Sequence, residues 1–387
     1  MLKIIVNSVF RGWRQMTRRP LYLCMMILAP IVCAWFFMDL MKDGVVQHTP
    51  VGIVDLDQSD LSRKLTRNLA AFPQVSIEKT YSNYQEALDG VKRGEVFGFF
   101  FIPENFSEKA LGFNKPTLSF YINYSYFSPA SMQYKGFKTL SVLANGGIVS
   151  SALSSLGMPS EMTAATLQPV VTHVHALHNP WSSYNYYLSA SFVPCLLALI
   201  MLLITVFTIG MEWHAGTSRN WMRTAGNSII LATVTKLFPH TFIFTAVGSV
   251  IQFMMYCVYG LPLNCNPWHM ILAMFLLVVA CQSFALTVCC LVPNFRYAST
   301  ICTLLGMLSF SYCGFSVPEE AMYSWIRPLG YLMPIKYYFK ISIDQALNGV
   351  DLYYSRFYYV ALIGYCFLPL AGLWNLKRHC LKPFYIP

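Results

Sequence analysis

The chain has 387 residues, of which 56% are hydrophobic and only 11% are charged. Soluble domains carry about 25% charged residues, so this composition excludes an ordinary soluble protein and indicates an integral membrane protein. The formal net charge of +10 does not indicate a nucleic-acid partner, because the Lys and Arg residues cluster at the ends of apolar runs, as they do in membrane proteins.

The N-terminal residues 1–19 mix apolar side chains with five basic ones and include Trp13. This pattern predicts an amphipathic helix that lies in the cytoplasmic membrane interface. Residues 20–41 are long and apolar enough for transmembrane helix 1, which we expect to be an uncleaved anchor because no small-residue cleavage site follows. The basic residues in front of it place the N-terminus in the cytoplasm.

Residues 42–180 form a polar stretch between the first apolar run and the rest. Alternating and continuous apolar patterns predict strands over 51–57 and 95–102, and a helical pattern covers 129–156. We expect a mixed α/β domain outside the cytoplasm, inserted between helices 1 and 2. The stretch contains no cysteine, so it is not a disulfide scaffold; the twelve cysteines of the chain lie mainly in apolar runs, as packing residues.

Three histidines lie close together near the end of this stretch: His173, His175 and His178. They could bind a metal ion, but surface or packing histidines are the simpler interpretation, since no further ligand accompanies them. Elsewhere no CxxC or Cys/His spacing of a metal site occurs.

Residues 181–375 carry five more apolar runs, which predict transmembrane helices 2–6 at 187–209, 234–259, 270–292, 298–317 and 358–374. Six crossings return residues 376–387 to the cytoplasm as a short tail. The expected cytoplasmic segments carry basic residues: five at the N-terminus, two (Arg219 and Arg223) between helices 2 and 3, one (Arg296) between helices 4 and 5, and three in the C-terminal tail. The short outer loop 260–269 carries none, as the positive-inside rule requires.

The second outer segment, residues 318–355, is apolar but interrupted by prolines. Broken segments of this kind enter a membrane only where protein or a water-filled cavity covers them. We expect one or two short re-entrant helices at the outer mouth, marked by Pro318, Glu319, Pro328 and Pro334.

A polar island, residues 210–227, separates helices 2 and 3. We expect it to be a cytoplasmic coupling segment, with Trp213 and Trp221 anchored at the interface and Arg219 and Arg223 facing an acidic groove of a motor protein. An ordinary cytoplasmic loop is the alternative. Lys236 follows within an apolar run, where a central lysine costs about 3 kcal/mol, and we expect its side chain to reach outward to the interface.

No GxxxxGK[ST] phosphate-binding loop occurs in the chain, so ATP and Mg²⁺ would have to bind to another polypeptide. No acid, base, nucleophile or metal set can be nominated for catalysis, so we do not expect the chain to be an enzyme or to carry a cofactor of its own.

Several motifs resemble permease subunits of type-2 ABC exporters, in the subgroup with a large outer domain after the first helix. They are VGIVDLDQSDLSRKLTRNL (51–69), EALDGVKRGEVFGFFFIPENFS (86–107), Asn179-Pro180, Phe192-Val193-Pro194, Glu212 with Gly216 and Thr217, Lys236 to Pro239, and GFSVPEEAM (314–322) with Pro334.

The resemblance implies a multi-pass protein of the inner (plasma) membrane that works as a homodimer or heterodimer of permeases above two ATPase subunits. Glu212, Gly216 and Thr217 would then belong to the segment that couples to the ATPase. The outer domain would dock a periplasmic membrane-fusion adaptor or sample the substrate, which we expect to be apolar or amphipathic because the helices offer little buried charge. The alternative from another class is a non-transporting envelope protein, anchored in the bilayer, whose outer domain binds a partner.

Overall fold

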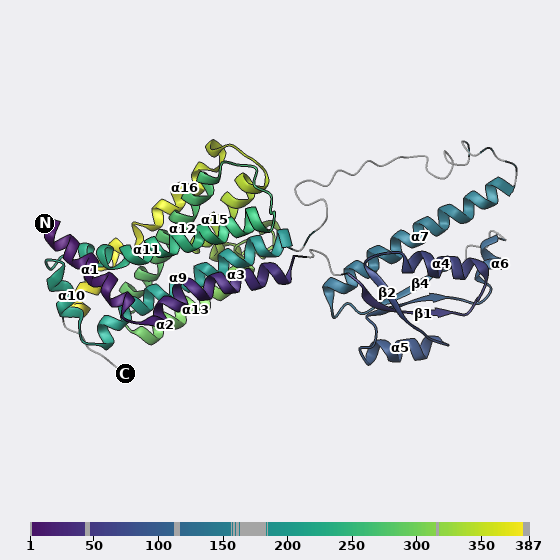
Figure 1. Cartoon of the computed structure of the whole chain (residues 1–387), viewed down its shortest axis with the longest axis horizontal. Coiled ribbons are helices and arrows are strands. Elements are labelled where there is room, and N and C mark those ends of the chain that lie inside the picture. Colours follow the sequence, from purple (N-terminus) through teal and green to yellow (C-terminus); the bar gives the residue numbers. More distant parts are fainter. Residues whose placement is uncertain are drawn as a thin grey trace. The chain divides into compact units, whose positions relative to one another are not determined.

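The computed structural model describes residues 2–42, 47–111, 117–155, 185–314 and 317–381, together with residues 157, 159, 162 and 183. The chain folds into two compact units: a small unit made from residues 45–176, and a helical unit made from residues 1–44 and 177–387 (Figure 1). Each unit is considered by itself. His173, His175 and His178 lie outside the described residues, so the metal hypothesis for them stays a hypothesis.

The small unit contains a four-stranded sheet with the strand order β2-β1-β3-β4. Strand β1 is parallel to β2 and to β3, with Val51 opposite both Ile77 and Gly98, whereas β4 is antiparallel to β3. The strands are β1 (Thr49–Asp55), β2 (Val75–Thr80), β3 (Gly98–Ile102) and β4 (Ser119–Ile122), and the helices are α4 (Asp60–Ala70), α5 (Tyr84–Lys92), α6 (Phe106–Leu111) and α7 (Phe127–Ser155).

Both faces of this sheet are covered, which explains the continuous apolar sequence of β3. On one face Phe100 packs with Phe137 of α7 and Leu65 of α4; on the other face Phe99 packs with Ala87 of α5. Figure 1 shows α4 and α7 on one side of the strands and α5 on the opposite side. The described residues of this stretch contain both strands and helices, and α7 covers most of the range expected for the long helix.

The helical unit begins with α1, turns, and continues through the apolar run that starts at Pro20. Its elements are α1 (Leu2–Thr17), α2 (Pro20–Leu23), η1 (Cys24–Leu28), α3 (Ala29–Leu40), η2 (Asn185–Ser189), α9 (Ala190–His214), α10 (Ser218–Thr224), α11 (Ile229–Phe253), η3 (Met254–Val258), α12 (Pro267–Leu291), α13 (Phe295–Tyr312), η4 (Glu319–Ala321), α14 (Arg327–Gly330), α15 (Pro334–Ile341), η5 (Ser342–Leu347), α16 (Leu352–Tyr365), η6 (Leu368–Ala371) and α17 (Leu373–Leu381).

In the part of the chain that the structure describes, three helical segments are long and apolar enough to cross a membrane: Asn185–His214, Ile229–Val258 and Pro267–Leu291. A fourth would be the pair Leu352–Ala371 and Leu373–Leu381, which is bent by 43°. The two other predicted crossings are shorter or more polar: the first contains the apolar helix Cys24–Leu40, and α13 starts with the polar sequence Phe295-Arg296-Tyr297. Helix α13 ends at Tyr312 rather than at the predicted 317, and Gly314, with φ +90°, follows the turn.

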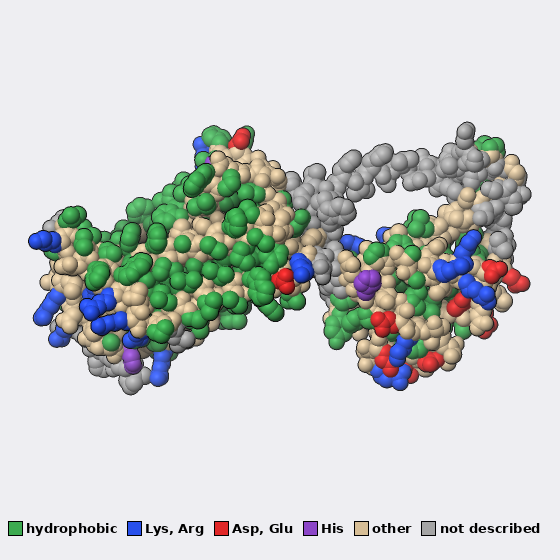
Figure 2. Space-filling view, viewed as in Figure 1, with side chains coloured by type: hydrophobic (Ala, Val, Ile, Leu, Met, Phe, Trp, Pro, Cys, Tyr) green, Lys and Arg blue, Asp and Glu red, His purple; other side chains and the backbone are tan. Residues whose placement is uncertain are grey.

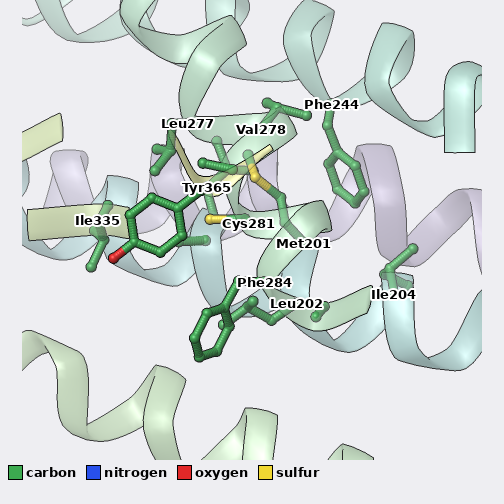
Figure 3. Packing of buried hydrophobic residues seen from close by; sticks show 14 of the residues in the cluster. Met201, Leu202, Ile204, Phe244, Leu277, Val278, Cys281, Phe284, Ile335 and Tyr365 are labelled. Atoms are coloured by element: carbon green, nitrogen blue, oxygen red, sulfur yellow. The ribbon is translucent and has the colours of Figure 1, made fainter. Parts of the chain in front are cut away.

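Helix α9 lies in the core of the helical unit and packs against α12 and α13. Figure 3 shows Met201 and Leu202 of α9 beside Cys281 and Phe284 of α12, in a cluster that also takes Ile335 and Tyr365. The backbones of α9 and α13 approach closely, since a Cβ at Gly306 would lie 2.7 Å from Leu199 Cδ1. The cysteines of this core are free thiols that fill space, as expected.

Hydrophobic side chains cover most of the visible face of the helical unit, and Lys and Arg side chains gather at the end that carries the N-terminus (Figure 2). Large apolar residues such as Phe238, Phe242 and Phe253 are exposed on α11. A surface of this kind suits hydrocarbon rather than water, because soluble proteins rarely expose apolar patches of such extent.

Candidate coupling site

The polar island is a short helix held between two tight turns. Helix α9 continues to His214, beyond the predicted start of the island at residue 210. Gly216 (φ +65°) then reverses the chain before α10, and Gly226 (φ +65°) does the same after it. These two positions favour glycine because other side chains rarely adopt that backbone conformation. Ser228 accepts a hydrogen bond from the amide of Leu231 and starts α11.

Glu212, in the last turn of α9, is the centre of a buried ionic cluster, which we call the Glu212 clasp and which consists of Arg11, Glu212, Thr217 and Lys236. Only 1% of Glu212 is exposed. Its carboxylate lies 2.9 Å from the Arg11 guanidinium, pairs with Lys236, and accepts a hydrogen bond from the Thr217 hydroxyl. A buried carboxylate is tolerated when charged and hydrogen-bonding partners replace water in this way.

Lys236 is buried as well, with 5% of its surface exposed. Besides Glu212, its ammonium donates to Gln15 Oε1 at 3.3 Å and lies 5.0 Å from the centre of the Trp221 ring. The expectation that this side chain reaches outward to the interface is therefore wrong. The carboxylate on the neighbouring helix supplies the charge partner that the apolar run itself lacks.

Helix α1 packs directly on α11 through a narrow face of small residues. Ser8 and Thr235 share a hydrogen bond between hydroxyls at 2.6 Å. At Gly12 an added Cβ would lie 3.4 Å from the carbonyl oxygen of Lys236, so the two backbones touch. The opposite, apolar side of α1, with Leu2, Val6 and Phe10, is exposed, as an interfacial helix requires.

Helix α10 is fixed to two neighbours. The Trp221 indole donates to the carbonyl of Ala232 in α11 at 3.1 Å, while Ser218 Oγ and Arg219 Nε donate to the carbonyls of Cys380 and Leu381 in α17, each at 3.0 Å. Trp213 and Trp221 are buried in the protein, so the expectation that they anchor at the interface is wrong. Arg219 and Arg223 are exposed, as expected.

The predicted outer segment contains the short helices η4, α14 and α15, and Pro328 and Pro334 each lie in the first turn of one. Glu319 binds two lysines, Lys336 at 3.3 Å and Lys340 at 3.1 Å, and accepts a hydrogen bond from Tyr331. Partial burial raises the pKa of the Glu319 carboxyl, but the two lysines outweigh it and hold that pKa below its ordinary value.

The structure thus brings Glu212 and Thr217 together with residues that the sequence did not assign to the site, namely Arg11 and Lys236. One signal was present for Lys236: it is the basic residue within the apolar run after the island. Nothing in the sequence marks Arg11. Among the described residues, no group of three or more His, Cys, Asp or Glu side chains could hold a metal ion.

Comparison with known families matches residues 20–374 to the model described as ABC-2 family transporter protein. No curated protein matches the chain. The matched range includes the apolar run after α1, the small unit, the island and the outer segment.

Proposed function

Because the chain belongs to the ABC-2 family of transporter proteins, we propose that it is the permease subunit of an exporter driven by a separate ATPase, and that α10 is the contact through which the ATPase acts. A transporter of this family is a membrane component that works with an ATPase partner.

The observation that carries the proposal is the way α10 is built into the helical unit. Its exposed side presents Arg219 and Arg223, which suit an acidic surface. Its buried side is bonded to α11 through Trp221 and to α17 through Ser218, and the turn before it is bonded through Thr217 to Glu212. A displacement of α10 is therefore passed to α9 and α11 through hydrogen bonds and ion pairs rather than lost in a loose loop.

We further propose six membrane crossings, formed by the segments Pro20–Leu40, Asn185–His214, Ile229–Val258, Pro267–Leu291, Phe295–Tyr312 and Leu352–Leu381. With both termini in the cytoplasm, Arg219, Arg223 and Arg296 are cytoplasmic, which agrees with the positive-inside rule. Residues 42–180 are then extracytoplasmic, and residues 318–355 lie at the outer mouth.

A groove between α11, α12 and the C-terminal helices supports an apolar or amphipathic substrate. It has a volume of about 420 Å³ and is lined by aromatic and aliphatic side chains, among them Phe238, Phe242 and Phe275, with Thr241 and Gln282 as hydrogen-bonding groups. Sites for small apolar molecules commonly combine an apolar lining with a few polar groups. We expect the functional unit to contain two permeases, alike or different, and we expect the small unit to meet an adaptor outside the membrane.

Purification of the protein from its membrane in mild detergent, followed by identification of the bound proteins, tests the proposal. The exporter predicts an ABC ATPase in the complex in an amount comparable to the permease. Purification of a folded, multi-pass protein with an extracytoplasmic partner but without any ATPase would contradict it and favour the membrane-anchored binding protein instead.

A further inference from the structure

A cavity of about 250 Å³ lies beside the Glu212 clasp, where the chain turns from α1 into α2. Its walls come from α1, α2, α9 and α11, all within the helical unit. Arg18, Arg19 and Gln15 form part of its polar wall, and Phe207 and Met211 of α9 form part of its apolar wall. The cavity is therefore amphipathic.

The polar wall carries an excess of positive charge. Glu212 supplies one negative charge, but it is already shared between Arg11 and Lys236. Arg18 and Arg19 also line the cavity and have no carboxylate within ion-pair distance among the described residues; Arg19 contacts the sulfur of Met211 at 3.6 Å. Since Lys236 is nine-tenths buried or more, its charge is poorly screened by water, and an anion in the cavity would be attracted by Lys236 of α11 and by the two arginines between α1 and α2.

The position of this wall along the chain indicates which anion it meets. Arg18 and Arg19 directly precede the apolar run that starts at Pro20, so they lie at the level of the lipid headgroups. The apolar wall from Phe207 and Met211 belongs to the membrane-crossing segment Asn185–His214. Basic pockets between membrane helices at this depth are suited to phosphate headgroups, with hydrocarbon chains along the apolar wall.

We propose that this cavity binds the phosphate of an anionic phospholipid and that the bound lipid strengthens the attachment of α1 to α9 and α11 at the Glu212 clasp. The phosphate oxygens would bind to Arg18 and Arg19, and the acyl chains would pack against Phe207. The proposed topology serves only to assign the lipid to the cytoplasmic leaflet. Lipid binding needs no ATPase. The lipid proposal can therefore be wrong while the exporter proposal holds, and the exporter proposal can be wrong while the lipid proposal holds.

The test measures thermal unfolding of the delipidated full chain in detergent micelles while either dioleoyl phosphatidylglycerol or dioleoyl phosphatidylcholine is added. A ligand that binds the folded state raises the melting temperature in proportion to the logarithm of its concentration. We expect phosphatidylglycerol to raise the melting temperature with this logarithmic dependence and phosphatidylcholine to have little effect. Equal effects of the two lipids would overturn the proposal.

The variant Arg18→Gln/Arg19→Gln should weaken the phosphatidylglycerol effect, so that about thirtyfold more lipid is needed for the same shift, since each basic residue near a lipid surface changes affinity about fivefold. The matched control Lys3→Gln/Arg14→Gln removes the same charge from exposed positions of α1 that do not line the cavity. If both variants weaken the phosphatidylglycerol effect equally, the effect comes from general surface charge, and the proposal of a specific site in the cavity is wrong.

Glycerol 3-phosphate distinguishes the two sources of phosphate. The lipid proposal predicts that it has no effect at concentrations where phosphatidylglycerol raises the melting temperature, because it lacks the acyl chains. If it raises the melting temperature as much as the lipid does, the cavity is a site for a soluble phosphate and the lipid proposal is wrong. The comparison of headgroups in the unaltered protein decides the question even if the double variant does not fold.

Discussion

Glu212 and Lys236 stand 24 positions apart in the chain and form an ion pair between α9 and α11 in which both side chains are buried. The pair connects the last turn of α9, which precedes α10, to α11, which follows α10 in the chain. It joins the membrane helices to the segment that we propose as the ATPase contact, and Arg11 extends it to α1.

Removal of one member of this pair should destabilise the protein strongly. Glu212→Gln leaves the buried Lys236 and the partly buried Arg11 without a carboxylate, and Lys236→Met leaves the carboxylate with Arg11 alone. Breaking a buried ion pair costs about 3–5 kcal/mol, whereas replacing both partners by neutral groups costs much less. Thermal unfolding in detergent should therefore show that the double variant loses less stability than the sum of the single variants. Additive losses would mean that the two charges do not interact.

Helix α1 should be linked to α11 by a disulfide when Ser8 and Thr235 are both changed to cysteine, because their hydroxyl oxygens lie 2.6 Å apart. The background should lack the native cysteines. The matched control pairs Thr235→Cys with Val6→Cys, whose side chain is exposed. Efficient oxidation of the first pair and not of the second is expected by gel mobility after cleavage in the chain between them. Equal oxidation would contradict the packing.

The small unit should lose local stability at acid pH through Asp57. Burial raises the pKa of this carboxyl, but hydrogen bonds from Ser59 and Ser107 outweigh it and hold the pKa below 3.8. A carboxyl whose pKa is lower in the folded than in the unfolded state stabilises the fold at pH values above the unfolded-state pKa. This contribution disappears as the pH falls through the lower, folded-state pKa. Amide hydrogen exchange at Ser107 should accelerate there, beyond its intrinsic pH dependence. Asp57→Asn should remove this additional acceleration of exchange, whereas the control Asp60→Asn, at an exposed position, should keep it. Acceleration that persists in Asp57→Asn would contradict the role of Asp57.

Glu319→Gln should weaken the outer segment. Lys336 is buried against Glu319 and lies 3.3 Å from the centre of the Tyr331 ring, so loss of the carboxylate leaves its charge with the aromatic ring alone. We expect a loss of about 2–3 kcal/mol, measured by thermal unfolding. The neighbouring Glu320→Gln is the control, since Glu320 is exposed and forms no ion pair in the described part of the chain. Equal effects of the two changes would contradict a structural role for the Glu319 cluster.

Local patterns in the sequence predict the elements well. The strands expected at 51–57 and 95–102 are β1 and β3, and the helix expected over 129–156 is α7, because alternation and continuous apolar runs report burial directly. The polar island was also found from its composition. The ion-pair partners of Glu212 could not be predicted in this way. Its polarity marked Glu212 as a candidate, but the sequence could not show that it pairs with Lys236 and with Arg11, which is 201 positions away. Contacts between distant helices leave no periodicity in the chain.

The most direct test of the central claim reverses the charge on the exposed side of α10. In Arg219→Glu/Arg223→Glu, the ATPase that co-purifies with the permease should fall at least about tenfold, because like charges now meet an acidic surface. The melting temperature should change little. The control Arg296→Glu changes an exposed arginine in the other proposed cytoplasmic loop and should keep the ATPase. Full retention of the ATPase and of its activity in the α10 variant would contradict the assignment of α10 as the coupling contact.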